Sequence, residues 1–433
     1  MRFERFILAG LVFLLPVMAR WPFNLVLNAT LAQKIEPVDL FFALTFPIWL
    51  LRACRSDRRA VRLPPGSIVL AAFLCGAALS ALLAPDVGAA LLEVAGFLYV
   101  AFFYLFLFNL LRREEERRFA VDAFLLSACA VLLIGAAGII AYRVAGVESF
   151  AIARAATYAQ PVGEVVTRAR ATFSGENLFF VYGLLAAALS LPRLAGAGGW
   201  VRAAARANVA LMAIIAVSAP YRGAFIFWGL CTIALWDAGR RWWRKALLGL
   251  TALLFLATLG LSIVQARVQL FPARLAADRD SGQISLTLSR RDAFYYLLHR
   301  GAVRMFLEAP LLGVGPGRFN AMIRQERYGA AAGLGGLDPH STYFGALAES
   351  GLVGALPLFL FYAAILVLLL RLARRAAAPG APWRMLLACY VLLLVYAVYI
   401  DLTTMRVLWF IYALIAAAAR FEGEPSGVEQ PPD

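Results

Sequence analysis

Residues 351–370 read GLVGALPLFLFYAAILVLLL, an unbroken run of apolar residues without a single charged side chain. A helix of about 20 such residues is long enough to cross the hydrocarbon core of a bilayer. Because a backbone in lipid has no water to bond with, only helices and closed barrels span membranes. The run is continuous rather than alternating, so it predicts a transmembrane helix.

Similar runs recur along the chain, which has 433 residues, is 62% hydrophobic and has a mean hydropathy of +0.77. This composition lies far outside the range of soluble globular proteins. The sequence therefore predicts an all-α polytopic membrane protein with about twelve transmembrane helices. Their approximate ranges are 5–20, 37–51, 67–84, 90–111, 119–141, 176–191, 207–219, 223–238, 246–265, 351–370, 385–401 and 406–420. The segment 218–223 fits either a tight hairpin or a break in one long helix.

The net charge of +15 comes almost entirely from arginine. In a soluble protein this excess would suggest nucleic acid, but here membrane topology explains it and no nucleic acid is expected. The positive-inside rule makes the side with the basic connections cytoplasmic, together with both termini. We also expect an uncleaved first helix. These connections are 52–62, 112–118, 240–245 and 371–384.

The expected organisation has four parts. Residues 1–265 form an N-terminal bundle of about nine helices, and 266–350 form one long loop on the non-cytoplasmic face. Residues 351–420 form the last helices, and the tail 421–433, rich in Pro, Gly and Glu, is expected to be disordered. Within the loop, apolar residues at helical spacing predict a helix over 290–308 lying against the bundle.

The five cysteines and the glycines carry no cofactor signal. The cysteines fall in apolar or basic segments without metal-ligand spacing, so we expect neither disulfides nor a metal site. The spacing Gly313-x-Gly315-x-Gly317 is not a dinucleotide fingerprint, because no strand is expected before it. We interpret it as a turn that needs glycine, and we expect no cofactor.

His340, one of two histidines, is the candidate general base. It lies in the long loop, where an imidazole could remove a proton from an acceptor. Nearby arginines would keep its ring neutral, and Asp338 is close enough in sequence to orient it. The simpler interpretation is a histidine that caps or hydrogen-bonds the loop. The other histidine, His299, is expected to be a surface or packing residue.

Arginines at the same face are candidates to bind an anionic substrate. Guanidinium groups match phosphate oxygens and keep their charge, so Arg222, Arg290 and Arg291 could hold a pyrophosphate. For Arg222 the alternative is snorkelling to lipid headgroups, and for Arg290 and Arg291 it is a solvated helix start. Glu349 is expected to pair with an arginine or to cap a helix.

Several motifs together resemble the superfamily of O-antigen ligases and polymerases. They are Pro310-Leu311-Leu312-Gly313-Val314-Gly315-Pro316-Gly317-Arg318-Phe319, then His340-Ser341-Thr342-Tyr343, then Ala348-Glu349-Ser350-Gly351-Leu352-Val353-Gly354. Two further pieces agree: Arg170-Ala171-Thr172-Phe173-Ser174-Gly175-Glu176-Asn177 and Tyr221-Arg222-Gly223.

The resemblance implies a GT-C-like, metal-independent, inverting glycosyltransferase of the bacterial inner membrane, with its active site facing the periplasm. It would transfer a glycan from undecaprenyl pyrophosphate, a donor embedded in the membrane lipid, to the hydroxyl group of an acceptor sugar. His340 would be the base. The implied pyrophosphate-binding residues are Arg222, Arg291, Arg290 and Arg170, with Arg300 kept open, and the supporting residues are Asp338, Glu349 and Arg318.

The expected acceptor is lipid A-core, which makes the protein an O-antigen ligase of lipopolysaccharide biosynthesis. A repeat-unit or exopolysaccharide polymerase, extending a growing polysaccharide, is the alternative, and transfer to a protein comes third. A transporter of lipid-linked glycan is the rival from another class. It is disfavoured because transporters place ionisable residues at mid-bilayer, whereas here the arginines gather at one face.

Overall fold

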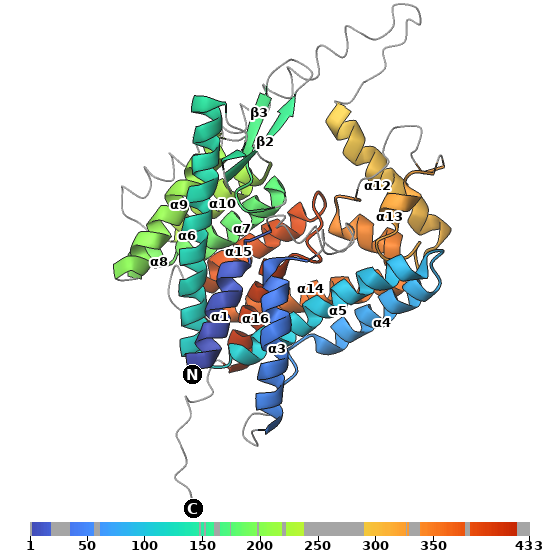
Figure 1. The fold of residues 1–433 in the computed structure, drawn as a ribbon, viewed down its shortest axis with the longest axis horizontal. Helices are drawn as coiled ribbons and strands as arrows, with labels where there is room; N and C mark the ends of the chain where they lie inside the picture. The colour runs from blue at the N-terminus through green and yellow to red at the C-terminus, as the bar shows by residue number, and fades with distance from the viewer. Residues whose placement is uncertain are drawn as a thin grey trace, which may run out of the picture.

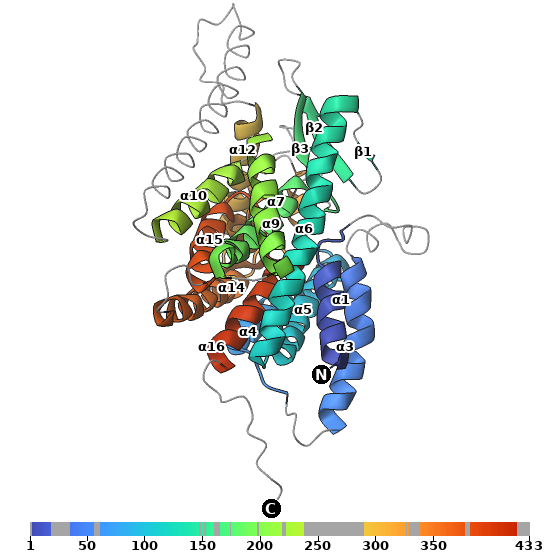
Figure 2. The ribbon, with the colours of Figure 1, turned by 90° about the vertical axis from the view of Figure 1, so that its left-hand side faces the viewer.

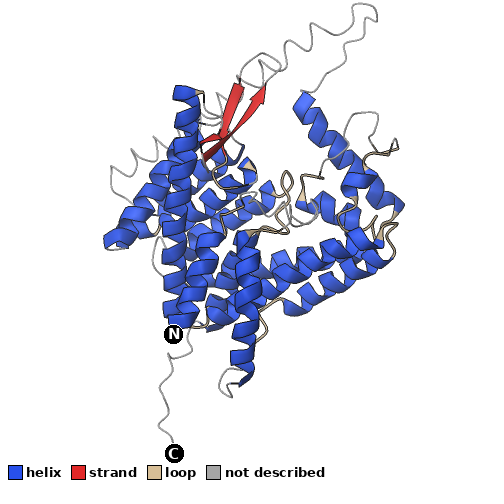
Figure 3. Cartoon of the chain, viewed as in Figure 1, coloured by secondary structure: helices blue, strands red, loops and turns tan. Residues whose placement is uncertain are grey.

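The computed structural model describes residues 2–18, 35–55, 61–146, 149–150, 153–159, 165–173, 175–196, 199–218, 222–237, 290–325, 327–328, 338–376 and 382–421. Most of these residues are helical (Figure 3). The predicted helix 246–265 and the tail 421–433 beyond Phe421 lie outside the described residues.

Each of the remaining predicted spans contains a helix, which confirms the helical framework. The helices in these spans are α1 (Arg2–Leu14), α3 (Pro37–Arg55), α4 (Ser67–Leu82), α5 (Val87–Leu110), α6 (Glu114–Ala145), α7 (Glu176–Ser190), α9 (Gly199–Ser218), α10 (Arg222–Asp237), α14 (Thr342–Arg375), α15 (Pro382–Tyr396) and α16 (Arg406–Phe421). The predicted loop helix is α12 (Arg290–Glu308), and two short helices are α8 (Arg193–Gly196) and α13 (Phe319–Met322). α9 and α10 are separate helices that pack on each other.

The structure adds a small antiparallel sheet that the sequence did not predict. Its strands are β1 (Ser149–Phe150), β2 (Ala153–Ala159) and β3 (Val165–Ala169), in that order. β2 and β3 pair in a register that places Ala156 opposite Arg168. β-branched residues in β3 favour an extended chain, but strands this short give too weak a pattern to stand out.

The helices have the lengths and surfaces of a membrane protein. Five of them, α3, α5, α6, α9 and the long α14, are long and apolar enough to cross a bilayer. Large apolar side chains are exposed on the outside of the bundle, for example Ile68 at 87% and Leu44 at 70%. Water would disfavour such a surface, whereas lipid would cover it. The chain is therefore a membrane protein, and the count of twelve spans stays a prediction.

Figures 1 and 2 show how the elements are placed along the bundle. α1 begins and α16 ends at one end, whereas the sheet and the start of α12 lie at the other. At the centre, the Trp409 ring of α16 stacks on Phe361 of α14, with centroids 5.4 Å apart, and meets Tyr104 of α5 edge-on. α14 also packs on α4, α12 and α15, so it connects the core to the loop region.

Candidate active site

His340 directly precedes α14 and has an unusual backbone. Its φ is 47°, in the left-handed region that residues other than glycine seldom adopt. Such a conformation costs on the order of 1–3 kcal/mol and persists only where the surroundings enforce it. The next residue, Ser341, caps the helix, since its Oγ accepts a hydrogen bond from the Phe344 N–H at 3.3 Å. The half-buried imidazole is therefore held at the start of a long helix.

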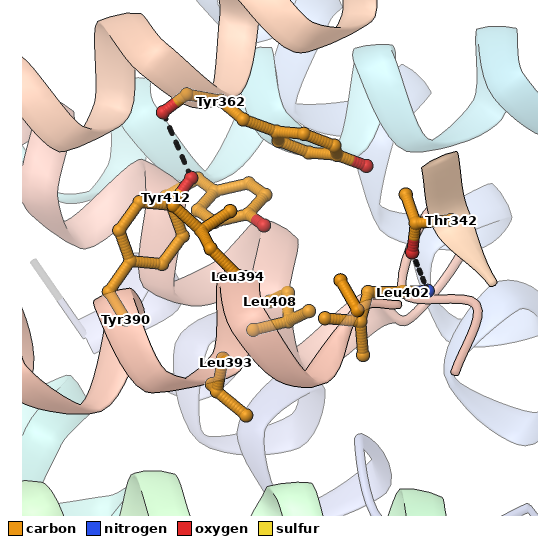
Figure 4. A pocket seen from close by; sticks show the side chains of 9 residues that line it. Thr342, Tyr362, Tyr390, Leu393, Leu394, Leu402, Leu408 and Tyr412 are labelled. Atoms are coloured by element: carbon orange, nitrogen blue, oxygen red, sulfur yellow. Dashed lines mark hydrogen bonds between the residues drawn. The ribbon is translucent and has the colours of Figure 1, made fainter. Parts of the chain in front are cut away.

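The turn between α15 and α16 enforces this conformation. The Thr342 N–H donates to the carbonyls of Ala397 and Ile400, at 2.9 and 3.1 Å. The Thr342 hydroxyl donates to the Ile400 carbonyl at 3.0 Å and accepts from the Leu402 N–H at 2.9 Å (Figure 4). The Ser341 hydroxyl also reaches the Ala397 carbonyl, at 3.3 Å. These bonds join two segments that are far apart in sequence. The segment that follows His340 is therefore held in place by tertiary contacts.

Three carboxylates in the described part of the chain act electrostatically on His340. Burial lowers the pKa of His340 from its ordinary value, and Asp338, Glu176 and Asp401 partly oppose that shift. The sequence analysis expected arginines to keep the ring neutral. In the part of the chain that the structure describes, desolvation disfavours the imidazolium, while the neighbouring carboxylates would stabilise it once formed. The contribution of the arginines stays a prediction.

Asp401 and Glu176 come from two other elements. Thr403 holds Asp401, donating to its Oδ1 from the backbone N–H at 2.9 Å and from the hydroxyl at 2.7 Å. Asp401 is an exposed residue of the turn between α15 and α16. Glu176 is the first residue of α7, and its neighbour Asn177 accepts a hydrogen bond from the Tyr396 hydroxyl at 3.2 Å. Three segments, at 176–177, 338–342 and 396–403, thus meet around the imidazole.

His299, the second histidine, lies next to this site. It comes from α12, and its ring stacks on Phe344 with centroids 4.6 Å apart and an interplanar angle of 29°. Burial lowers the pKa of His299, and the charge of His340 lowers it further, which shows that the two imidazoles are close. His299 does pack, as expected, but its place beside the candidate base was missed. The sequence carried no signal for it beyond the scarcity of histidine.

The glycine-rich turn after α12 has the conformational role that the sequence predicts. Gly313, Gly315 and Gly317 all have positive φ, at 68°, 103° and 67°. A Cβ on Gly313 would lie 2.5 Å from the Glu349 carbonyl, so no side chain fits there. The backbone of the turn donates from Val314 to the Ala348 carbonyl and from Gly315 to the Glu349 carbonyl, both at 2.9 Å.

Glu349 holds this turn from the other side. Its Oε1 accepts a hydrogen bond from the Phe319 N–H, at the start of α13, at 3.0 Å. Two residues later α14 is kinked at Gly351, where φ is 57° and ψ is −163°. There the N–H of Leu352 donates to the Pro310 carbonyl at 2.8 Å. Glu349 therefore lies within α14 and accepts a hydrogen bond at the start of α13, whereas it was expected to pair with an arginine or to cap the last span.

The candidate arginines are only partly placed. Arg318 forms an ion pair with Asp86, with Nη1 and Oδ2 2.9 Å apart. Arg170 is half-buried and follows β3, in the segment that leads to α7. Arg222 is the first residue of α10, which packs on α7 and α15.

Arg290 and Arg291 begin α12, which packs on α14, and Arg300 further along α12 is exposed. The structure does not describe the side chains of Arg222, Arg290 and Arg291. All three belong to helices that pack on the elements around His340. Their roles in binding pyrophosphate stay predictions.

A comparison with models of protein families gives a match to part of the chain. Residues 207–359 match the family model described as O-antigen ligase. This range contains the starts of α10 and α12, the glycine-rich turn, His340 and the kink at Gly351. A search of curated proteins found no match to the chain. The resemblance inferred from the motifs thus agrees with this match, which makes residues 207–359 similar to the O-antigen ligase family.

Proposed function

We propose that this membrane protein is a metal-independent, inverting glycosyltransferase that moves a glycan from undecaprenyl pyrophosphate to a sugar hydroxyl of lipid A-core. The observation that carries this proposal is the environment of His340 within the domain of the O-antigen ligase family. The half-buried imidazole is favoured in its neutral form and feels the charge of three carboxylates. A neutral base with anionic neighbours suits the transfer of one proton.

In the proposed reaction His340 takes the proton from the acceptor hydroxyl as that oxygen attacks the anomeric carbon. The new glycosidic bond forms while the bond to the pyrophosphate oxygen breaks, and the pyrophosphate leaves with the electron pair. A single displacement inverts the anomeric centre. Asp338, Glu176 and Asp401 then stabilise the imidazolium that forms. General-base assistance of this kind is typically worth about 10²- to 10⁴-fold in rate.

Arginines would bind the donor and stabilise charge on the leaving group. Arg222, Arg290 and Arg291 belong to the matched domain and begin helices that pack on the elements around His340. Arg170 lies outside the match but close in sequence to Glu176. Guanidinium groups bind phosphate oxygens bidentately, and preorganised charge usually lowers the barrier of an enzymatic reaction more than any other effect.

The arrangement of the helices supports a periplasmic active site. Thr342, two residues after His340, is bonded to the turn that precedes α16, whereas α16 ends at the same end of the bundle as the start of α1 (Figure 1). The segment that carries His340 therefore lies near the start of α16, away from the helix end that shares its side of the bundle with the start of α1. If the basic connections are cytoplasmic, as the positive-inside rule predicts, the imidazole faces the periplasm of the inner membrane.

Transfer by purified protein in lipid nanodiscs tests the proposal. The substrates are undecaprenyl-pyrophosphate-linked glycan and lipid A-core, and the product is the glycosylated core. We expect His340→Gln and His340→Ala to lose at least about 100-fold in kcat. Both variants should keep their membrane insertion and thermal unfolding temperature. Near-normal transfer by either variant would refute the role of His340.

The acceptor is tested by replacing lipid A-core with a second lipid-linked repeat unit. Transfer to lipid A-core alone identifies an O-antigen ligase, and elongation of the lipid-linked glycan alone identifies a polymerase. Movement of the donor across the membrane without any new glycosidic bond would overturn the proposal in favour of a transporter.

A further inference from the structure

Three aromatic rings from three different elements gather beside His340. His299 comes from α12, Phe344 from the first turn of α14, and Tyr399 from the turn between α15 and α16. The His299 ring lies 4.6 Å from Phe344 and 6.4 Å from Tyr399, measured between centroids. His299 is thus the central ring of the three. We call these three residues the aromatic wall.

The wall is fixed relative to the base. Ile400, the neighbour of Tyr399, accepts a hydrogen bond from the Thr342 N–H at 3.1 Å. Phe344 is bonded through its own N–H to Ser341, the residue after His340. His299 and His340 lie near enough for the charge of one to act on the other. Every member of the wall is therefore connected to the segment that carries the imidazole.

The wall is also open to a ligand. Tyr399 is 40% exposed, and both His299 and Phe344 are partly exposed. Aromatic faces carry negative charge density, which attracts the weakly positive C–H groups on the face of a sugar ring. The lowered pKa of His299 keeps this ring uncharged at neutral pH, so it adds a neutral π surface rather than a cation. Binding pockets commonly combine such apolar surfaces with a few polar groups.

We propose that His299, Phe344 and Tyr399 form a subsite for the sugar ring that carries the acceptor hydroxyl. This inference rests on the proposed function. The acceptor rather than the donor is assigned, because the hydroxyl must come within hydrogen-bond reach of the base and the wall adjoins that base. A sugar packed on the wall would present its hydroxyl groups towards His340, while the pyrophosphate of the donor would bind the arginines.

Steady-state kinetics of substitutions at Tyr399, the most exposed ring, tests the subsite. We expect Tyr399→Ala and Tyr399→Leu to raise KM for lipid A-core by roughly 3- to 10-fold, the range expected for one aromatic contact. Their kcat and their KM for the lipid-linked donor should stay near the wild-type values. Tyr399→Trp keeps a π face and should restore the acceptor KM.

The leucine variant separates a sugar subsite from a ring that contacts lipid headgroups. Leucine preserves apolar contact with lipid but has no π face, so a normal acceptor KM in Tyr399→Leu would overturn the proposal. A rise confined to the donor KM would overturn the assignment to the acceptor. Phe13→Ala is the matched control, because Phe13 is 45% exposed on α1, an element without site residues. Its kinetics should not change.

A second variant tests the central ring. His299→Phe keeps the stack on Phe344 and should keep the acceptor KM within about threefold of wild type, whereas His299→Ala should raise it. Failure of this inference is distinguishable from failure of the proposed function. If the wall variants behave as wild type while His340→Ala is inactive, only the subsite is wrong. If His340→Ala transfers normally, the proposed function is wrong.

Discussion

Two regions at the start of α14 belong to the motifs of the resemblance, yet the structure gives them different kinds of surroundings. At residues 338–342, side-chain and backbone bonds from the α15–α16 turn hold a partly exposed imidazole among carboxylates. At 348–353, the backbone of α14 packs directly against the backbone of the glycine-rich turn, so closely that no side chain fits between them. The first region keeps a titratable group accessible, and the second excludes ligands by close packing.

This difference shows that a titratable residue in a family motif does not necessarily take part in the reaction. Glu349 and His340 are both titratable and nine positions apart in the sequence. Glu349 bonds to the backbone of the turn, so its acceptor oxygen already has a structural task. His340 is held by its neighbours, and its own ring faces charges that a reaction can use. We therefore expect substitutions at the kink to affect stability and substitutions around His340 to affect activity.

The largest effect is expected for Gly351→Ala. Its φ of 57° and ψ of −163° lie in a region open essentially only to glycine, and a Cβ would lie 2.4 Å from the Leu311 carbonyl. We expect a loss of about 3 kcal/mol or more, measured as a lower thermal unfolding temperature in detergent. The matched control is Gly96→Ala on α5, where a Cβ meets nothing within 4 Å. Equal stability of the two variants would contradict the close packing at the kink.

Glu349→Ala should have the next largest effect on stability. It removes the acceptor of the Phe319 N–H, and an unsatisfied buried donor costs about 1–3 kcal/mol. Glu349→Gln keeps an acceptor oxygen and should recover most of that loss. Thermal unfolding and transfer activity are measured on both variants. A Gln variant that is stable but inactive would break the comparison, because it would place chemistry at the kink.

Asp401→Asn tests the region around His340. His340 acts as a base only when neutral, so activity is lost as the pH falls through its pKa. Asp401 raises that pKa, and removing its charge lowers the pKa further, which shifts the acid limb to lower pH by up to about one unit. The imidazolium also loses a stabilising charge, so kcat near pH 7 should fall by up to about tenfold. A pH–rate profile tests this, and a shift to higher pH would contradict it.

Arg318→Ala is expected to have the smallest effect. The ion pair with Asp86 joins side chains that are 18% and 51% exposed, and pairs of this kind contribute about 0–1 kcal/mol. Stability and transfer should both stay close to wild type, as in the exposed control Arg324→Ala. Loss of transfer with a raised KM for the donor, seen only in Arg318→Ala, would instead place Arg318 in the pyrophosphate site.

Most of the helical framework could be predicted from the sequence because its signals are local. Apolar runs mark the helices, and helical spacing predicts 290–308, the range that α12 occupies. The start of α14 was not predicted, since the expected span begins at residue 351 whereas the helix begins at Thr342. The polar residues Ser341 and Thr342 look like loop in sequence, yet they cap the helix and bond to the α15–α16 turn.

The candidate site could be predicted only in part. His340 stands out through its rarity and its motif, and Asp338 through its closeness in sequence. Glu176, Asp401 and His299 are separated from His340 by long stretches of chain, so no local pattern connects them. Their effects on the imidazole follow from helix packing.

The sequence by itself determined the class of this protein: a helical membrane protein, a glycine-rich turn and one histidine in the motif of a family. These properties depend on composition, on spacing and on residue types that a short segment carries alone. Only the tertiary structure decided what surrounds that histidine. Burial, two carboxylates and a second imidazole arrive from α7, α12 and the α15–α16 turn, because packing in three dimensions brings together groups that the chain keeps apart.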